Sequence, residues 1–142
     1  RGAKLLMICT GTGAAPMRAM TERRRRRLGL DEGGSILLFF GARSPSELPY
    51  FGPLMKLPKA LIDVELALSR VGGQPKLWVQ DRIRARAADV VGLLQGDDSF
   101  VYLCGHKNME RDVLKTLREL MPAFDERRAA LEREGRFHIE TS

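Results

Sequence analysis

Five short apolar segments are spaced along the chain, and a glycine or a polar residue follows most of them. The first of them, residues 5–9, is a continuous apolar run, which is typical of a strand that is buried on both faces of a sheet. We therefore predict strands over residues 5–9, 35–43, 62–70, 99–105 and 136–142.

Between these runs, apolar residues recur at the spacing of helices. This spacing predicts helices over residues 17–28, 79–94, 108–120 and 123–135, the first of which follows Pro16 and ends at Gly29. Four prolines in residues 44–58 exclude a long helix there. Strands that alternate with helices predict an α/β fold, namely a doubly wound, mostly parallel five-stranded sheet with helices on both faces.

The composition, 142 residues of which 44% are hydrophobic and 30% charged, is that of one globular domain over residues 1–142. No apolar run approaches the roughly 20 residues that span a bilayer, and no secretory signal is visible. Cys9 and Cys104 each end an apolar run without metal-ligand spacing. These observations predict a cytoplasmic protein with two reduced thiols, no metal site and no contact with a membrane. Because the first residue is Arg1, we expect a fragment of a longer polypeptide.

The net charge is +6, and five consecutive arginines, Arg23–Arg27, contribute much of it. Such a run is first of all typical of a solvated helix face or loop. A docking surface for an acidic protein or an anionic substrate is the next interpretation. Binding of nucleic acid ranks last, because no aromatic residues interleave with the run.

In open parallel sheets, ligands bind beyond the carboxyl ends of the strands. Glycines, hydroxyls and cations gather after the predicted strands, a combination that suits a ligand carrying phosphates. Singly, each is most often a turn or surface residue, and the Gly-x-Gly after the first strand lacks the third glycine of the usual dinucleotide fingerprint. The residues concerned are Thr10, Gly11, Thr12, Gly13, Arg43, Ser69, Arg70, Lys76, Gly105 and Lys107, and the last strand adds Glu140.

Several segments in the same order resemble the ferredoxin–NADP reductase family. "GTGAAPMRAM" is similar to its Gly-Thr-Gly-x-Ala-Pro-x-Arg segment, and "VYLCGHKNMERDV" to its Tyr-x-Cys-Gly-x-x-x-Met motif. Ser69-Arg70, "KLWVQ" and the terminal "HIETS" resemble further motifs of its plant-type members. A narrower likeness, to reductases that serve an oxygenase, is carried by "ELPYFGPLMKLP" and "RVGGQPK".

The resemblance implies a Rossmann-like NADP(H)-binding domain whose FAD-binding barrel lies upstream of Arg1. It implies that hydride passes from NADPH to FAD, and that electrons continue to a ferredoxin-like iron–sulfur protein or an oxygenase component. The isolated fragment is then inactive without its FAD domain.

The resemblance also assigns residues. Thr10, Gly11, Thr12, Gly13 and Pro16 match the turn that holds the pyrophosphate, with Thr12 on the nicotinamide side. Ser69, Arg70 and Lys76 match the set that recognises the 2′-phosphate, Trp78 a tyrosine that stacks on adenine, and Gln80 a polar residue at the adenosine end. Cys104, Gly105 and Met109 fall in the Cys-Gly motif, where Cys104 shapes the nicotinamide pocket, and Glu140 positions nicotinamide or relays protons. Lys107 is a phosphate or docking contact, and Ser142 stands where the family has an aromatic residue over the flavin.

Other interpretations remain open. No acidic residue stands at Ser69 or Arg70, as a preference for NADH would favour, but an NADH-linked ferredoxin or flavodoxin reductase is still an alternative. A nucleotide-binding module without activity of its own is another, and a basic nucleic-acid-binding domain is the third.

Overall fold

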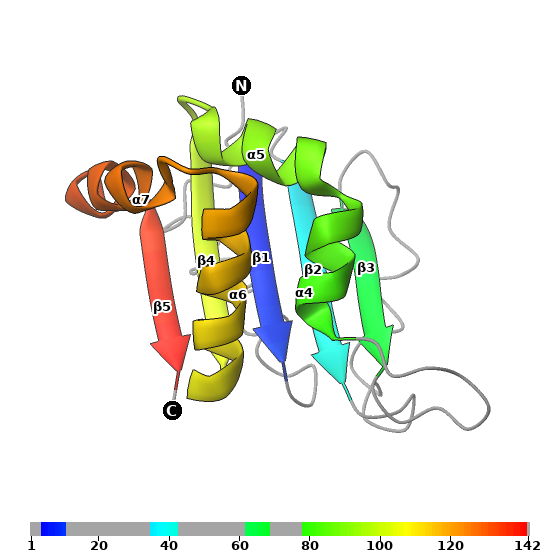
Figure 1. Cartoon of the computed structure of the whole chain (residues 1–142). Helices are drawn as coiled ribbons and strands as arrows, with labels where there is room; N and C mark the ends of the chain where they lie inside the picture. The colour runs from blue at the N-terminus through cyan, green and yellow to red at the C-terminus, as the bar shows by residue number, and fades with distance from the viewer. Residues whose placement is uncertain (1–3, 11–34, 43–61, 69–77, 142) are drawn as a thin grey trace.

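A parallel five-stranded sheet forms the centre of the structure, a computed structural model that describes residues 4–10, 35–42, 62–68 and 78–141 (Figure 1). The strand order is β3-β2-β1-β4-β5, and every neighbouring pair is parallel. The strands are β1 (Lys4–Thr10), β2 (Ser35–Ala42), β3 (Ile62–Leu68), β4 (Ser99–Gly105) and β5 (Phe137–Thr141). The predicted α/β class and the five strands are therefore confirmed, whereas Arg43 and Ser69-Arg70 lie outside the described residues.

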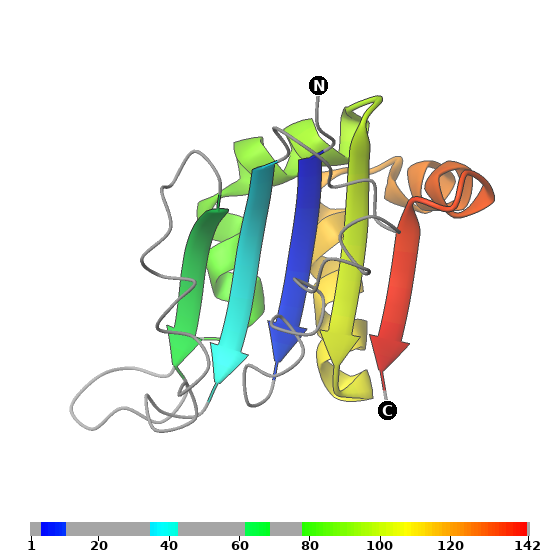
Figure 2. The ribbon, with the colours of Figure 1, turned by 180° about the vertical axis from the view of Figure 1, so that it is seen from behind.

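Four helices are described, and they lie on one side of the sheet, as the two opposite views show (Figures 1 and 2). They are α4 (Val79–Ala85), α5 (Ala87–Gln95), α6 (Lys107–Leu120) and α7 (Phe124–Arg133). The helices predicted over 108–120 and 123–135 are confirmed. The helix predicted over 17–28, the arginine run and the proline-rich segment 44–58 lie outside the described residues. None of the described helices is long and apolar enough to cross a membrane.

The single helix predicted over 79–94 is wrong, because the chain breaks at Arg86 into α4 and α5. Arg86 leaves the helical conformation (φ −114°, ψ 32°). Its guanidinium contacts Asp63 at 2.9 Å and Glu65 at 2.8 Å on β3, and Asp89 at 2.8 Å on α5. The break follows from this anchorage to a strand that is distant in sequence.

Both faces of the central part of the sheet are buried. Toward the helices, Leu6 and Ile8 of β1 pack with Phe39 and Leu103 in a core that all four helices complete. The residues that alternate with these point to the opposite face, and Met7, for example, is fully buried there. This explains why β1, β2 and β4 are apolar along nearly their whole length, whereas charged or polar residues alternate with apolar ones in the edge strands β3 and β5.

The expectation of two reduced thiols is wrong, because Cys9 and Cys104 form a disulfide. The two cysteines are direct partners in the register of β1 and β4, with Cα atoms 4.8 Å apart. That separation lies within the range that a disulfide spans. The bond also removes the two reduced thiols as support for the cytoplasmic expectation, since disulfides are rare in that compartment.

Candidate functional site

The order of the strands reverses at β1. The chain runs outward from β1 through β2 to β3, and then returns to place β4 on the other side of β1. In open parallel sheets, the carboxyl ends of the strands at such a switch point form the usual ligand site. Here these ends are Thr10 of β1 and Gly105 of β4.

Small residues form a row across this edge of the sheet. Ala67 of β3 pairs with Gly41 of β2, which in turn pairs with Thr10. A Cβ on Gly41 would lie 3.2 Å from the Thr10 methyl group. Gly105 has a φ of +133°, and a Cβ there would overlap the Thr10 hydroxyl. The Thr10 side chain is thus held between two glycines, and the row leaves space above the strand ends.

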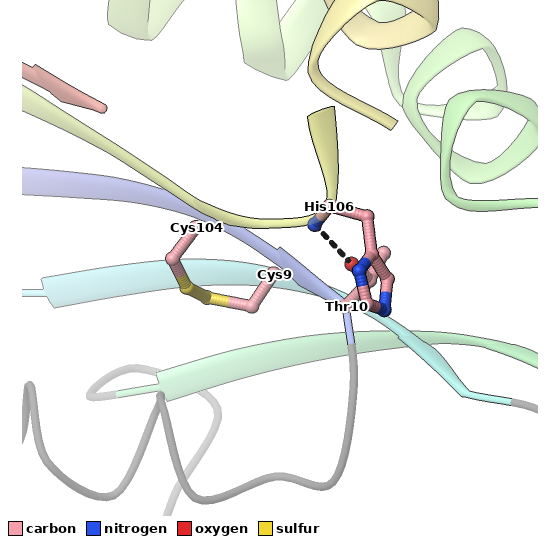
Figure 3. Close-up of a disulfide and its surroundings, with 4 residues drawn as sticks. All are labelled: Cys9, Thr10, Cys104 and His106. Atoms are coloured by element: carbon pink, nitrogen blue, oxygen red, sulfur yellow. Dashed lines mark hydrogen bonds between the residues drawn. A yellow bond between two sulfur atoms is a disulfide. The ribbon is translucent and has the colours of Figure 1, made fainter. Parts of the chain in front are cut away.

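The hydroxyl of Thr10 connects β1 to the start of α6. The backbone N–H of His106, the residue before α6, donates a long hydrogen bond of 3.4 Å to Thr10 Oγ1 (Figure 3). This contact fixes the beginning of α6 against the end of β1.

A second helix begins beside the same edge. The backbone N–H of Trp78 donates to Asp81 Oδ2 at 2.8 Å, which stabilises the first turn of α4. Arg82 Nε donates to the Leu66 carbonyl at 2.7 Å and ties α4 to β3. Trp78 itself is 50% exposed. Among the described residues, it is the large apolar side chain that is exposed.

A cavity of about 280 Å³ lies between the strand ends and the beginnings of α4 and α6. Its size is just below the roughly 300–1,000 Å³ of ligand sites, so it suits one part of a dinucleotide rather than the whole molecule. The described residues that line it are Thr10, Gly41, Ala67, Trp78, Val79, Gln80, His106, Asn108, Met109 and Asp112.

Four of the residues predicted from the sequence line this cavity together, namely Thr10, Trp78, Gln80 and Met109. They come from β1, α4 and α6, which are far apart in the sequence. The indole offers a flat face for stacking, and the neighbouring polar groups offer hydrogen bonds to the edge of a base. This set fits a nucleotide base. Gly105 shapes the site through its contact with Thr10, whereas Lys107 is exposed and does not line the cavity.

Cys104 and Glu140, predicted to act near the nicotinamide, are neighbours in the register of β4 and β5. By strand alternation both side chains point to the sheet face opposite the helices, and neither lines the cavity. The disulfide of Cys104 lies one residue before the Thr10 end of β1 (Figure 3). The role of the two residues stays a prediction.

The remaining predicted site residues lie outside the described residues. They are Gly11, Thr12, Gly13, Pro16, Arg43, Ser69, Arg70, Lys76 and Ser142. Among the residues that are described, no group of histidines, cysteines and carboxylates could hold a metal ion.

The sequence analysis assigned no role to three polar residues that line the cavity, His106, Asn108 and Asp112. Asn108 and Asp112 are four residues apart in the first half of α6 and therefore share one face of it. That spacing was visible in the sequence, but the helix was predicted from the apolar residues on its other side, and its polar side was not considered.

Comparison with known proteins agrees with this architecture. Residues 7–115 match the family model described as "Oxidoreductase NAD-binding domain". The chain is also similar to inducible nitric oxide synthase of Bos taurus, with 37% identity over 128 residues, and of Sus scrofa, with 37% identity over 123 residues. These matches cover 85% and 82% of this chain but span only 11% and 10% of the length of those relatives. Because the family model matches most of the chain, this protein belongs to the oxidoreductase NAD-binding domain family, the nucleotide-binding domain of reductases that resemble ferredoxin–NADP reductase.

Proposed function

We propose that this chain is the NADP(H)-binding domain of an FAD-dependent reductase. NADPH supplies a hydride, FAD accepts it, and the electrons pass on to a ferredoxin-like iron–sulfur protein or an oxygenase component. The observation that carries the proposal is the cavity at the switch point, where Trp78, Gln80, Thr10 and Met109 converge. In this proposal the domain binds and aligns the nucleotide, and the cofactors supply the redox chemistry.

The preference for NADPH rests on Ser69, Arg70 and Lys76. Ser69 and Arg70 directly follow β3, and Arg70 is three residues beyond Ala67, which lines the cavity. Three residues of extended chain span at most about 11 Å, so Arg70 stays within reach of the cavity. Lys76 precedes Trp78 by two residues, and Trp78 lines the cavity, so Lys76 also stays within reach of it. Two cations and a hydroxyl suit a dianionic 2′-phosphate.

The rest of the assignment follows the family. The turn formed by residues 10–16 holds the pyrophosphate, Cys104 and Glu140 border the nicotinamide, and an FAD-binding barrel precedes this domain in the chain. The oxidoreductase family match supports the reductase chemistry, and the small share of its relatives that the chain spans supports a domain that works inside a longer polypeptide.

Within the family, we propose a narrower assignment, the reductase component of benzoyl-coenzyme A epoxidase. Its support is the likeness of "ELPYFGPLMKLP" and "RVGGQPK", residues 47–58 and 70–76, to that protein. In this setting Arg23–Arg27 form a docking surface for an acidic partner.

The decisive experiment is calorimetric titration of the chain with 2′-phospho-AMP and, separately, with AMP. Neither ligand carries nicotinamide, so the flavin domain is not needed for the comparison. We expect the 2′-phosphate to improve affinity by about tenfold or more, which corresponds to about 1.4 kcal/mol. In Arg70→Ala the two ligands should bind equally, whereas Arg84→Ala, an exposed arginine on α4, should keep the difference.

Equal affinity of the unmodified chain for both ligands would remove the preference for NADPH and favour an NADH-linked reductase. If neither ligand binds, the proposed nucleotide site is wrong.

A further inference from the structure

Asp112 is the charged side chain among the described residues that line the cavity at the switch point. Among the described residues that line it there is no lysine and no arginine, but there is one carboxylate, Asp112. The other polar groups include the amides of Gln80 and Asn108, and Trp78 offers a half-exposed indole. A carboxylate accepts hydrogen bonds from an amine. The cavity therefore fits a base that carries an amino group.

The carboxylate of Asp112 has little competing interaction within the described part of the chain. Its ion pair there is with Arg111, whose Nε lies 4.0 Å away, and the two side chains are 49% and 75% exposed. A pair of that geometry contributes almost nothing to stability. The hydrogen bond that Thr116 Oγ1 donates to Asp112, at 2.9 Å, goes to the backbone carbonyl and leaves the carboxylate oxygens available.

The position of Asp112 is fixed by the packing of two helices. Asp112 lies one turn after Asn108 on α6, and the start of α6 is held to β1 through Thr10. On the other side of the cavity, Trp78 precedes α4, and α4 packs directly against α6. The carboxylate and the indole thus face one cavity from two helices that are linked to each other.

We infer that Asp112 determines the base specificity of this site: its carboxylate accepts a hydrogen bond from the exocyclic amine of adenine while the ring stacks on Trp78. The inference rests on the proposed function, because it assumes that the adenine end of the nucleotide occupies this cavity. Hypoxanthine carries an oxygen where adenine carries the amine, and a carboxylate repels that oxygen. The site should therefore discriminate between the two bases although their shapes are nearly the same.

The test compares adenosine 2′,5′-bisphosphate with inosine 2′,5′-bisphosphate by calorimetric titration of the whole chain. These probes differ only at the base, so the phosphate contacts cancel. We expect the adenine nucleotide to bind about tenfold more tightly or better, the range of a hydrogen bond to a charged group. In Asp112→Asn the side chain amide can present either its oxygen or its NH₂, so the ratio should fall close to one. Asp125→Asn, the same change at an exposed carboxylate of α7, should keep the ratio of the unmodified chain.

Equal binding of the two bases by the unmodified chain, or an unchanged ratio in Asp112→Asn, would overturn the role of Asp112 and leave the proposed function standing. An unchanged ratio is also the result expected if Asp112 contacts nicotinamide, since neither probe carries it. If the unmodified chain binds neither probe, the proposed function and this inference fail together.

Discussion

At the scale of single residues, Gly105 lies where the end of β4 approaches Thr10 of β1 closely. Its φ of +133° is a conformation that residues with a Cβ rarely adopt, and a Cβ there would overlap the Thr10 hydroxyl. We expect Gly105→Ala to lower the free energy of unfolding by about 2 kcal/mol or more. Because Thr10 lines the cavity, the same change should weaken binding of 2′-phospho-AMP. Urea denaturation and calorimetric titration measure the two effects.

Gly92 provides a matched control for this change. It lies in α5, and a Cβ there would meet no atom within 4 Å. Alanine is the better helix former, so Gly92→Ala should leave binding unchanged and stabilise the fold by about 0.5–1 kcal/mol. Equal stability of Gly105→Ala and the unmodified chain would contradict the close contact between Thr10 and Gly105.

At the scale of elements, Arg86 joins two helices to a strand. Its hydrogen bond with Asp63, followed by those with Asp89 and Glu65, raises the pKa of the Arg86 guanidinium above its usual value. The group therefore stays charged at any pH at which the protein is studied. The three carboxylates need this cation, since without it they would face one another across the junction of α4 and α5.

We expect Arg86→Ala to destabilise the chain by about 1–2 kcal/mol, as its partners are only partly buried. Urea denaturation measures the loss. Arg84→Ala should change stability by less than about 0.5 kcal/mol, because Arg84 makes exposed contacts of 3.4 Å. Similar losses in both variants would show that the junction does not depend on the Arg86 contacts.

Arg86 also shows what a local sequence pattern cannot predict. Nearly continuous apolar runs identified the central strands β1, β2 and β4, because a parallel sheet that is buried on both faces makes such strands apolar along their length. The edge strands β3 and β5 were also predicted, although charged or polar residues alternate with apolar ones in them. The periodicity over 79–94 also identified the helical segment correctly. It could not show the break at Arg86, because the cause lies in Asp63 and Glu65 on a distant strand.

At the scale of the whole molecule, the site depends on distances that the linear sequence does not contain. Resemblance to a family named Thr10, Trp78, Gln80 and Met109, which the structure brings into one cavity. It did not name Asp112, because the face that α6 turns toward the cavity is decided by its packing against α4. The pairing of Cys9 with Cys104 was missed for a related reason, since it follows from the register of β1 against β4.

The disulfide joins the two strands of the switch point across 95 residues of chain. The segment that it encloses contains β2, β3, α4 and α5, so cleavage should release conformational freedom in more than half of the unfolded chain. We expect a reducing agent to lower the free energy of unfolding by about 2–4 kcal/mol, a common contribution of a disulfide that closes a long loop. Urea denaturation with and without reductant measures this, and a thiol assay in denaturant should count no free thiols before reduction and two after it.

The double variant Cys9→Ala/Cys104→Ala is the control. It has no bond to reduce, so its stability should be close to that of the reduced unmodified chain both with and without reductant. If the unmodified chain is equally stable with and without reductant while its thiol count rises to two, the bond exists but does not constrain the fold; if two thiols titrate before reduction, the pairing itself is wrong.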